Sequence, residues 1–160
     1  MASLKQLLAK TLATTFGLGY IPIGPGTFGA AGGLLILSLL HLGQPTVWPS
    51  DHIVFWAATT LLFFVGVWAA KTLEPEWGED PSKIVIDEWL GLWVALAGMP
   101  FEWPYIIAGF VLFRLFDIWK PAGVRRMEQY GNGFGVMLDD LLAGIYANLI
   151  LRLILLQGWL

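Results

Sequence analysis

Five long apolar segments limit this chain to a small set of folds. Only the second has 18 consecutive residues without a charge, which is about the length that crosses a bilayer as a helix. The others are shorter or carry charges near one end, so full spans and half-spans both stay open. We therefore expect an all-α, polytopic helical membrane protein, a compact bundle of about four to five transmembrane or half-spanning helices. The segments are Phe28–Leu42, Ile53–Ala70, Ile84–Phe101, Trp103–Trp119 and Leu138–Leu160.

The composition agrees with a membrane environment. Hydrophobic residues make up 57% of the chain and charged residues only 13%, whereas a soluble domain has roughly a quarter charged residues. The 160 residues contain no polar or low-complexity linker, so one domain over 1–160 is expected. A net charge of -3 without a basic run argues against a nucleic-acid partner. The absence of cysteine excludes disulfides, thiolate metal sites and cysteine nucleophiles.

The N-terminal segment, about residues 3–18, has the pattern of an amphipathic helix that lies in the membrane interface. Leu4, Leu7 and Leu8 fall on one helical stripe with Leu12, and Ser3 can cap the first turn. A plain first core helix is the alternative interpretation. The Gly- and Pro-rich stretch that follows, Gly19–Gly33, favours a turn before a helix that we expect to begin at Thr27.

The basic residues predict the topology. Two connections, 43–52 and 98–104, contain no Lys or Arg, and only Arg152 departs from the alternation. By the positive-inside rule the N-terminus lies in the cytoplasm and the C-terminus outside, with five crossings or near-crossings. His41 and His52 then fall on the outer side and are given no catalytic role. The basic residues on the inner side are Lys5, Lys10, Lys71, Lys83, Lys120, Arg125 and Arg126.

On this topology the acids of the apolar segments gather at the cytoplasmic side. Two lie at the start of the third segment, one at the end of the fourth and two at the start of the fifth. Thr27 begins the first segment at the same depth. The sequence therefore predicts a site near the inner interface, formed by Asp87, Glu88, Asp117, Asp139 and Asp140.

Helical spacing supports that site. Small residues follow the acids on the same faces, Gly91 after Asp87 and Gly144 after Asp140, and such stripes let membrane helices approach closely. In the fourth segment, spacing of i, i+3 and i+6 predicts two cations around one carboxylate on one face, until a proline ends the helix. These residues are Arg114, Asp117, Lys120 and Pro121.

Acids that face a bundle interior repel one another unless a cation lies between them. Mg²⁺ is the natural candidate, because it prefers a few carboxylate oxygens with water and substrate phosphate. Arg114, Lys120 and the backbone N–H groups at Thr27 can hold the phosphate. We therefore expect phosphoryl chemistry at the membrane surface, with a metal-activated water and a spare carboxylate as general base.

Other interpretations of the same residues stay open. Each acid alone can be a partner of a helix dipole, and Thr27 can be an N-cap. Asp80 and Lys83 can cap the third segment or reach the site. A small cation- or proton-coupled transporter using the same acids is the main alternative function, although it predicts a mid-membrane site and an inverted repeat. A structural membrane subunit is a further alternative.

Four motifs occur in order over nearly the whole chain, from about Leu12 to about Leu151, and together they resemble the phosphatidylglycerophosphatase A family. They are IPIGPGTFG (Ile21–Gly29), DPSKIVIDEWLG (Asp80–Gly91), FRLFDIWKP (Phe113–Pro121) and GFGVMLDDLLAG (Gly133–Gly144).

The resemblance implies a Mg²⁺-dependent membrane hydrolase of bacterial phospholipid synthesis that converts phosphatidylglycerophosphate to phosphatidylglycerol and inorganic phosphate. It also implies a multi-pass protein of the cytoplasmic (inner) membrane whose site faces the cytoplasm. The division of the acids between metal ligands and general base does not follow from it, nor does a choice between attack by water and a phospho-aspartate intermediate. The family's motifs fall on Asp87 and Glu88, on Asp117, Lys120 and Pro121, on Asp139 and Asp140, and on Pro25, Gly26 and Thr27.

Overall fold

The computed structural model describes residues 3–41, 53–121 and 123–159, and these residues form helices and connections without a β-strand. The predicted all-α class is confirmed. The connection Gly43–His52, with His52, lies outside the described residues. The helices are α1 (Leu4–Ala13), the 3₁₀ helix η1 (Leu18–Tyr20), α2 (Pro25–His41), α3 (Ile53–Trp77), α4 (Ile86–Leu96), α5 (Trp103–Trp119), α6 (Val124–Met127) and α7 (Phe134–Gln157).

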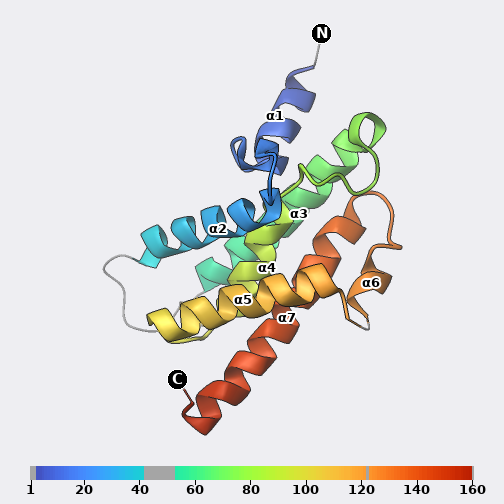
Figure 1. Cartoon of the computed structure of the whole chain (residues 1–160). Helices are drawn as coiled ribbons and strands as arrows, with labels where there is room; N and C mark the ends of the chain where they lie inside the picture. Colours follow the sequence, from blue (N-terminus) through green and yellow to red (C-terminus); the bar gives the residue numbers. More distant parts are fainter. Residues whose placement is uncertain (1–2, 42–52, 122, 160) are drawn as a thin grey trace.

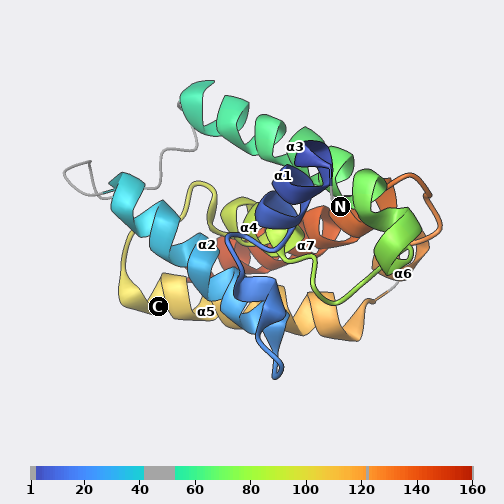
Figure 2. The same cartoon turned by 90° about the horizontal axis from the view of Figure 1, so that it is seen from above.

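Helix α4 is the centre of the bundle. It contacts α2, α3, α5 and α7, and Figure 2 shows it between α3 on one side and α5 on the other. Every residue of α4 except Trp89 is buried. Figure 1 shows α1 beside one end of α3, outside this arrangement. A helix that is buried on all sides needs partners for its polar groups, and the acids in its first turn are therefore unusual.

Small residues bring α4 and α7 close together. A Cβ atom at Gly91 would lie 2.7 Å from the backbone oxygen of Asp140, and one at Gly144 would meet the backbone oxygen of Gly91. The predicted small-residue stripes are confirmed at these two glycines. Because side chains at i and i+4 share a helix face, this contact carries Asp87 and Asp140 toward each other.

The far end of α4 stops inside the bundle. Its 11 residues give a length of about 16 Å, half of the roughly 30 Å hydrocarbon core. The side-chain amide of Asn148 donates to the backbone oxygens of Ala95 (2.9 Å) and Ala97 (2.8 Å), and Arg152 donates to Ala97 (3.2 Å). The helix of the third segment is therefore about half as long as a membrane span, and Arg152, the exception in the charge pattern, has a structural role.

Several helix boundaries differ from those expected. Helix α2 begins at Pro25 instead of Thr27, because proline fits the first turn of a helix. Helix α3 continues past Lys71 and through Pro75 to Trp77. Helix α7 begins at Phe134 instead of Leu138, after Gly133 in the left-handed conformation (φ 78°). The fourth segment is confirmed at both ends.

The N-terminal helix is amphipathic, as predicted. Ser3 forms a capping box with Gln6. Ala9 and Ala13 are buried in a cluster with Leu73 of α3, whereas Leu4 is 73% exposed.

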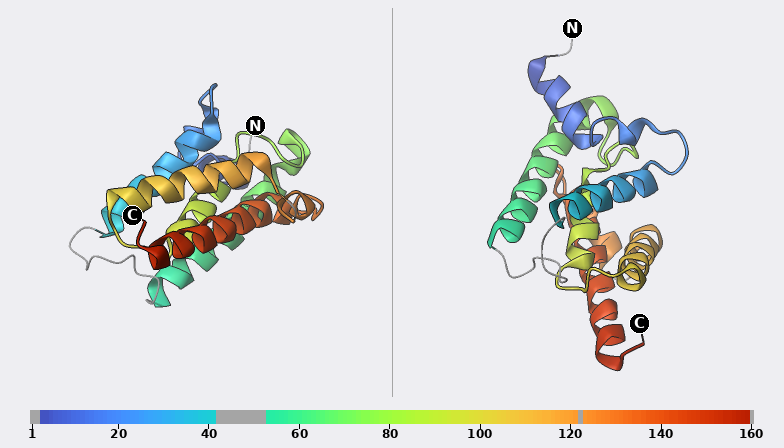
Figure 3. Two further views of the ribbon diagram at one scale, coloured as in Figure 1. Left: turned by 60° about the horizontal axis from the view of Figure 1, so that its bottom comes forward. Right: turned by 90° about the vertical axis from the view of Figure 1, so that its left-hand side faces the viewer.

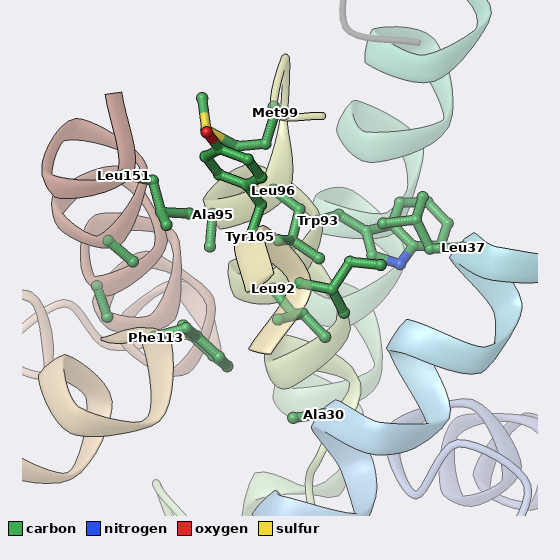
Figure 4. Packing of buried hydrophobic residues seen from close by; sticks show 14 of the residues in the cluster. Ala30, Leu37, Leu92, Trp93, Ala95, Leu96, Met99, Tyr105, Phe113 and Leu151 are labelled. Atoms are coloured by element: carbon green, nitrogen blue, oxygen red, sulfur yellow. The ribbon is translucent and has the colours of Figure 1, made fainter. Parts of the chain in front are cut away.

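The main core lies around the buried length of α4. Figure 4 shows Leu92 and Leu96 of α4 with Leu37 of α2 and Leu151 of α7, and Figure 3 shows α5 and α7 running alongside. The outer surfaces of the helices carry large exposed side chains such as Leu61. So much exposed apolar surface marks a membrane or partner interface. Helices α3 and α7 are long and apolar enough to cross a membrane.

Candidate active site

The first turn of α4 supplies two of the predicted acids. Asp87 and Glu88 are 9% and 7% exposed. The Glu88 N–H donates to a carboxylate oxygen of Asp87 (2.9 Å). The backbone that leads into the helix is fixed by a hydrogen bond from the Val85 N–H to the Ala13 oxygen (2.9 Å). The start of α4, which carries the two acids, is therefore tied to the end of α1.

Helix α7 supplies a second pair. Asp139 and Asp140 are buried, and the Asp140 N–H donates to Asp139 (3.0 Å). They lie in the second turn, since α7 begins earlier than expected. Asp87, Glu88 and Asp140 each offer an oxygen within 4.8 Å of the others. Oδ2 of Asp140 is buried and has no hydrogen-bond partner. A buried carboxylate oxygen without a partner is costly, and this one fits a cation ligand.

The two cations of the fourth segment serve different acids. Arg114 forms ion pairs with Glu88 and with Asp117 (2.8 Å to Asp117). Lys120 has a left-handed backbone (φ 47°), and its Nζ contacts Asp139 (2.7 Å) and Glu128 (2.5 Å). The spacing predicted both cations around Asp117, but within the described residues only Arg114 forms a pair with it. Lys120 leaves the helical stripe because the helix ends before Pro121.

These side chains share one cavity of about 230 Å³. It is lined by the start of α2, by the connection before α4, and by α4, α5 and α7. The cavity thus brings together all five predicted acids and both predicted cations. Its lining is Gly24, Pro25, Gly26, Asp80, Pro81, Ser82, Ile84, Asp87, Glu88, Arg114, Asp117, Lys120, Asp139 and Asp140.

The N-terminus of α2 approaches the acids at Gly26. A Cβ atom there would meet a carboxylate oxygen of Glu88 and lie 2.9 Å from Nη2 of Arg114. Glycine is therefore required for this close approach. Thr27 is exposed and does not line the cavity, so its phosphate-binding role stays a prediction. His41, at the opposite end of α2, is about 22 Å from Gly26 along the helix axis.

The sequence interpretation missed one residue beside the site and left another open. Glu128 follows the short α6 and pairs with Lys120, and no apolar segment or spacing pointed to it. Asp80, for which two roles were open, lines the cavity.

Burial and mutual repulsion govern the charges of the site. In α4, Asp87 and Glu88 are buried beside each other and beside Asp140, and the ion pair with Arg114 offsets part of this repulsion at Glu88. For Lys120, burial alone would lower the pKa, but its bonds to Asp139 and Glu128 outweigh this and raise it. Six carboxylates against two cations line the cavity, an excess of negative charge that a bound cation relieves.

The fold and the site together define a class: an all-helical, membrane-type protein that gathers buried carboxylates and two cations in one cavity. A family model described as Phosphatidylglycerophosphatase A matches residues 11–155. The chain belongs to the phosphatidylglycerophosphatase A family and is a phosphatase. This favours the phosphatase over the transporter interpretation.

Three curated bacterial relatives cover most of the chain. A Bacteroides thetaiotaomicron protein, provisionally named phosphatidylinositol-3-phosphatase, is 44% identical over 91% of this chain and 92% of its own length. Phosphatidylglycerophosphatase A of Haemophilus influenzae is 38% identical over 93% of this chain and 88% of its own length. That of Escherichia coli is 34% identical over 89% and 81%. No solved structure matches the chain.

Proposed function

We propose that the chain removes the terminal phosphate of phosphatidylglycerophosphate, in a Mg²⁺-dependent reaction at the cytoplasmic face of a bacterial inner membrane, to give phosphatidylglycerol and inorganic phosphate. The observation that carries the proposal is the convergence of Asp87, Glu88 and Asp140 in one cavity with Arg114 and Lys120. The names of the two phosphatidylglycerophosphatase A relatives support this substrate. The apolar outer surface supports action on a lipid.

The acids fit a hard divalent cation. The close oxygens of Asp87, Glu88 and Asp140, with the unpartnered Oδ2 of Asp140, are a suitable set of ligands. Asp117 and Asp139 are the further predicted ligands. When bound, Mg²⁺ supplies positive charge to the phosphate and lowers the pKa of a coordinated water.

The cations and the start of α2 fit the phosphate. The backbone N–H groups at Gly26 belong to the positive end of a 17-residue helix. Arg114 lies against Gly26, and its Nε is buried without a partner, so it keeps a free donor although it already pairs with Glu88 and Asp117. Lys120 adds a second charged donor.

Proton transfer falls to one of the predicted acids that does not hold the metal, and Asp117 and Asp139 are candidates for either role. A carboxylate beside the attacking water orients it and accepts its proton as the new oxygen–phosphorus bond forms. The ester oxygen–phosphorus bond breaks, and the proton passes to the glycerol oxygen that leaves, which gives phosphatidylglycerol and inorganic phosphate. Asp117 and Asp139 both line the cavity and both already pair with a cation, Asp117 with Arg114 and Asp139 with Lys120. Comparing kcat for Asp117→Asn and Asp139→Asn separates the two.

The test is release of inorganic phosphate by purified protein in detergent, with Mg²⁺ or with a chelator. The substrates are phosphatidylglycerophosphate, phosphatidic acid and phosphatidylinositol 3-phosphate. We expect turnover of the first, only with Mg²⁺, and loss of activity in Asp140→Asn. Glu102→Gln, at the exposed start of α5, is the matched control and should keep full activity. Preferred turnover of phosphatidylinositol 3-phosphate contradicts the substrate, and activity in chelator contradicts the metal.

A further inference from the structure

A second cavity, which plays no part in the proposed reaction, lies between α1, α3 and α4. Its volume is about 220 Å³, and Figure 2 shows the three helices side by side. At 100° per residue, the α4 side chains that line this groove lie on the face opposite Asp87 and Glu88. We call it the apolar groove. It is lined by Leu12, Thr15, Phe16, Ala58, Leu61, Leu62, Val65, Ile86, Trp89 and Trp93.

The groove runs along the depth of the bundle and opens onto its outer surface. On α3 it extends from Val65 to Ala58, about 10 Å of helix. On α4 it extends from Ile86 in the first turn to Trp93. At its rim Leu61 is 65% exposed, and it continues into the exposed apolar surface of α3, a helix long enough to cross a membrane. The groove is therefore continuous with the surface that faces lipid.

Two residues that line the groove have buried hydrogen-bonding groups without partners. Thr15 is 3% exposed, and its hydroxyl has no partner. The indole N–H of Trp89 is also buried and unpaired, and it lies on the side of the ring near Gly32 of α2. The hydrogen bond from Val85 to Ala13 places Thr15 beside the start of α4, at the level of the acids. The backbone of Thr15 is left-handed (φ 46°), which is strained for a β-branched residue.

A ligand that fits this groove is apolar along most of its length and has a hydrogen-bond acceptor at the end nearest the membrane surface. The acyl ester of a glycerophospholipid has this chemistry: its carbonyl lies at the boundary between headgroup and hydrocarbon. We infer that the apolar groove binds one acyl chain of a bilayer phospholipid, whose ester carbonyl accepts a hydrogen bond from the hydroxyl of Thr15. The inference does not depend on the proposed reaction, since the groove and the acids occupy opposite faces of α4.

Photo-crosslinking in vesicles tests the inference. The full chain is reconstituted with a phospholipid that carries a diazirine in one acyl chain, irradiated and mapped by peptide mass spectrometry. We expect adducts on Leu61 and Leu62, with Val111, an exposed residue of α5, as the reference for general lipid contact. Ala58→Phe, which fills the groove, should remove the groove adducts and keep those at Val111. Ala57→Phe, one position away on the exposed surface, should keep both.

A second comparison tests the hydrogen bond from Thr15 alone and does not depend on the variant that fills the groove. Thr15→Val should weaken retention of the ester lipid by about 2–10-fold, the change that one neutral hydrogen bond supplies. An ether-linked phospholipid with the same chains has no ester carbonyl, so wild-type protein and Thr15→Val should retain it equally. Equal labelling of Leu61 and Val111 in every variant would refute a specific site. Adducts at Val111 without adducts at Leu61 and Leu62 would show that no acyl chain enters the groove. If wild-type protein retained the ester and the ether lipid equally, the role of Thr15 would be refuted.

Discussion

Gly144→Ala tests whether the contact between α4 and α7 sets the geometry of the acids. The new Cβ atom would meet the backbone oxygen of Gly91 and lie 3.0 Å from its carbonyl carbon and 3.1 Å from its Cα. These are backbone atoms, which cannot rotate away. Restoring ordinary separations of about 3.5–4 Å requires the helices to part by roughly 0.5–1 Å. Asp140 lies one turn before Gly144 on the same face, so it moves away from Asp87 and Glu88.

The expected effect on activity exceeds the effect on stability. Overpacking costs about 1–3 kcal/mol, and alanine returns about 1 kcal/mol of helix propensity. The free energy of unfolding therefore falls by roughly 0–2 kcal/mol. A displacement near 1 Å at reacting groups can cost on the order of 100-fold in rate. We expect a 10–100-fold loss of phosphate release and a weaker apparent affinity for Mg²⁺, measured by titrating the metal beside a thermal unfolding curve in detergent.

The matched control is Gly131→Ala, because nothing lies within 4 Å of a Cβ atom there and its φ is not positive. It should leave activity, Mg²⁺ titration and unfolding unchanged. If Gly144→Ala keeps normal activity and a normal Mg²⁺ titration, the spacing of α4 and α7 does not set the site. If it loses activity only in proportion to unfolding, the effect is structural.

Three further predictions concern the phosphate, the end of α4 and the topology. Lys120→Met should raise KM by about 10–100-fold, the value of a hydrogen bond to a charged group. Lys71→Met, at an exposed position, should leave KM unchanged. Equal KM values for the two variants would remove Lys120 from the phosphate site. Asn148→Leu should lower the free energy of unfolding by about 1–3 kcal/mol because buried backbone oxygens at the end of α4 lose their donor, and a wild-type melting curve would contradict that capping role. The chain has no cysteine, so an impermeant maleimide should label Glu102→Cys in intact cells and Glu79→Cys only after permeabilisation; the reverse pattern would invert the topology.

Much of the fold followed from the apolar segments, but the ends of the helices did not. The fourth segment was predicted at both ends, and a proline marks each of them: Pro104 lies in its first turn and Pro121 follows its last residue. Helix α3 continues beyond Lys71 because that side chain is exposed in the last part of the helix, so its charge does not have to be buried. The half-length of α4 could not be seen in the sequence. Its end depends on hydrogen bonds from Asn148 and Arg152, which lie some 50 residues later in the chain.

The set of acids in the site was predictable, but their pairing was not. Charge asymmetry placed Asp87, Asp117 and Asp140 at one depth, and the cavity contains all of them. Helical spacing then assigned Lys120 to Asp117, which assumed that the helix continued through Lys120. The left-handed turn there redirects the side chain to Asp139 and Glu128. Pairing depends on local backbone geometry at a helix end, the part of a structure that periodicity describes least well.

The half-length of α4 explains how acids can be buried in so apolar a bundle. Burying a carboxylate is costly, but the first turn of a helix offers free N–H groups and a positive partial charge. Asp87 and Glu88 occupy that turn, and the start of α2 brings a second positive helix end to the same cavity at Gly26. The ends of a helix that crosses the whole bilayer lie at its two surfaces. A helix of half that length, such as α4, can begin at the depth that its contacts with the neighbouring helices set. Because Asn148 closes its other end, the depth of the acids depends on contacts with α7 and not on the thickness of the membrane.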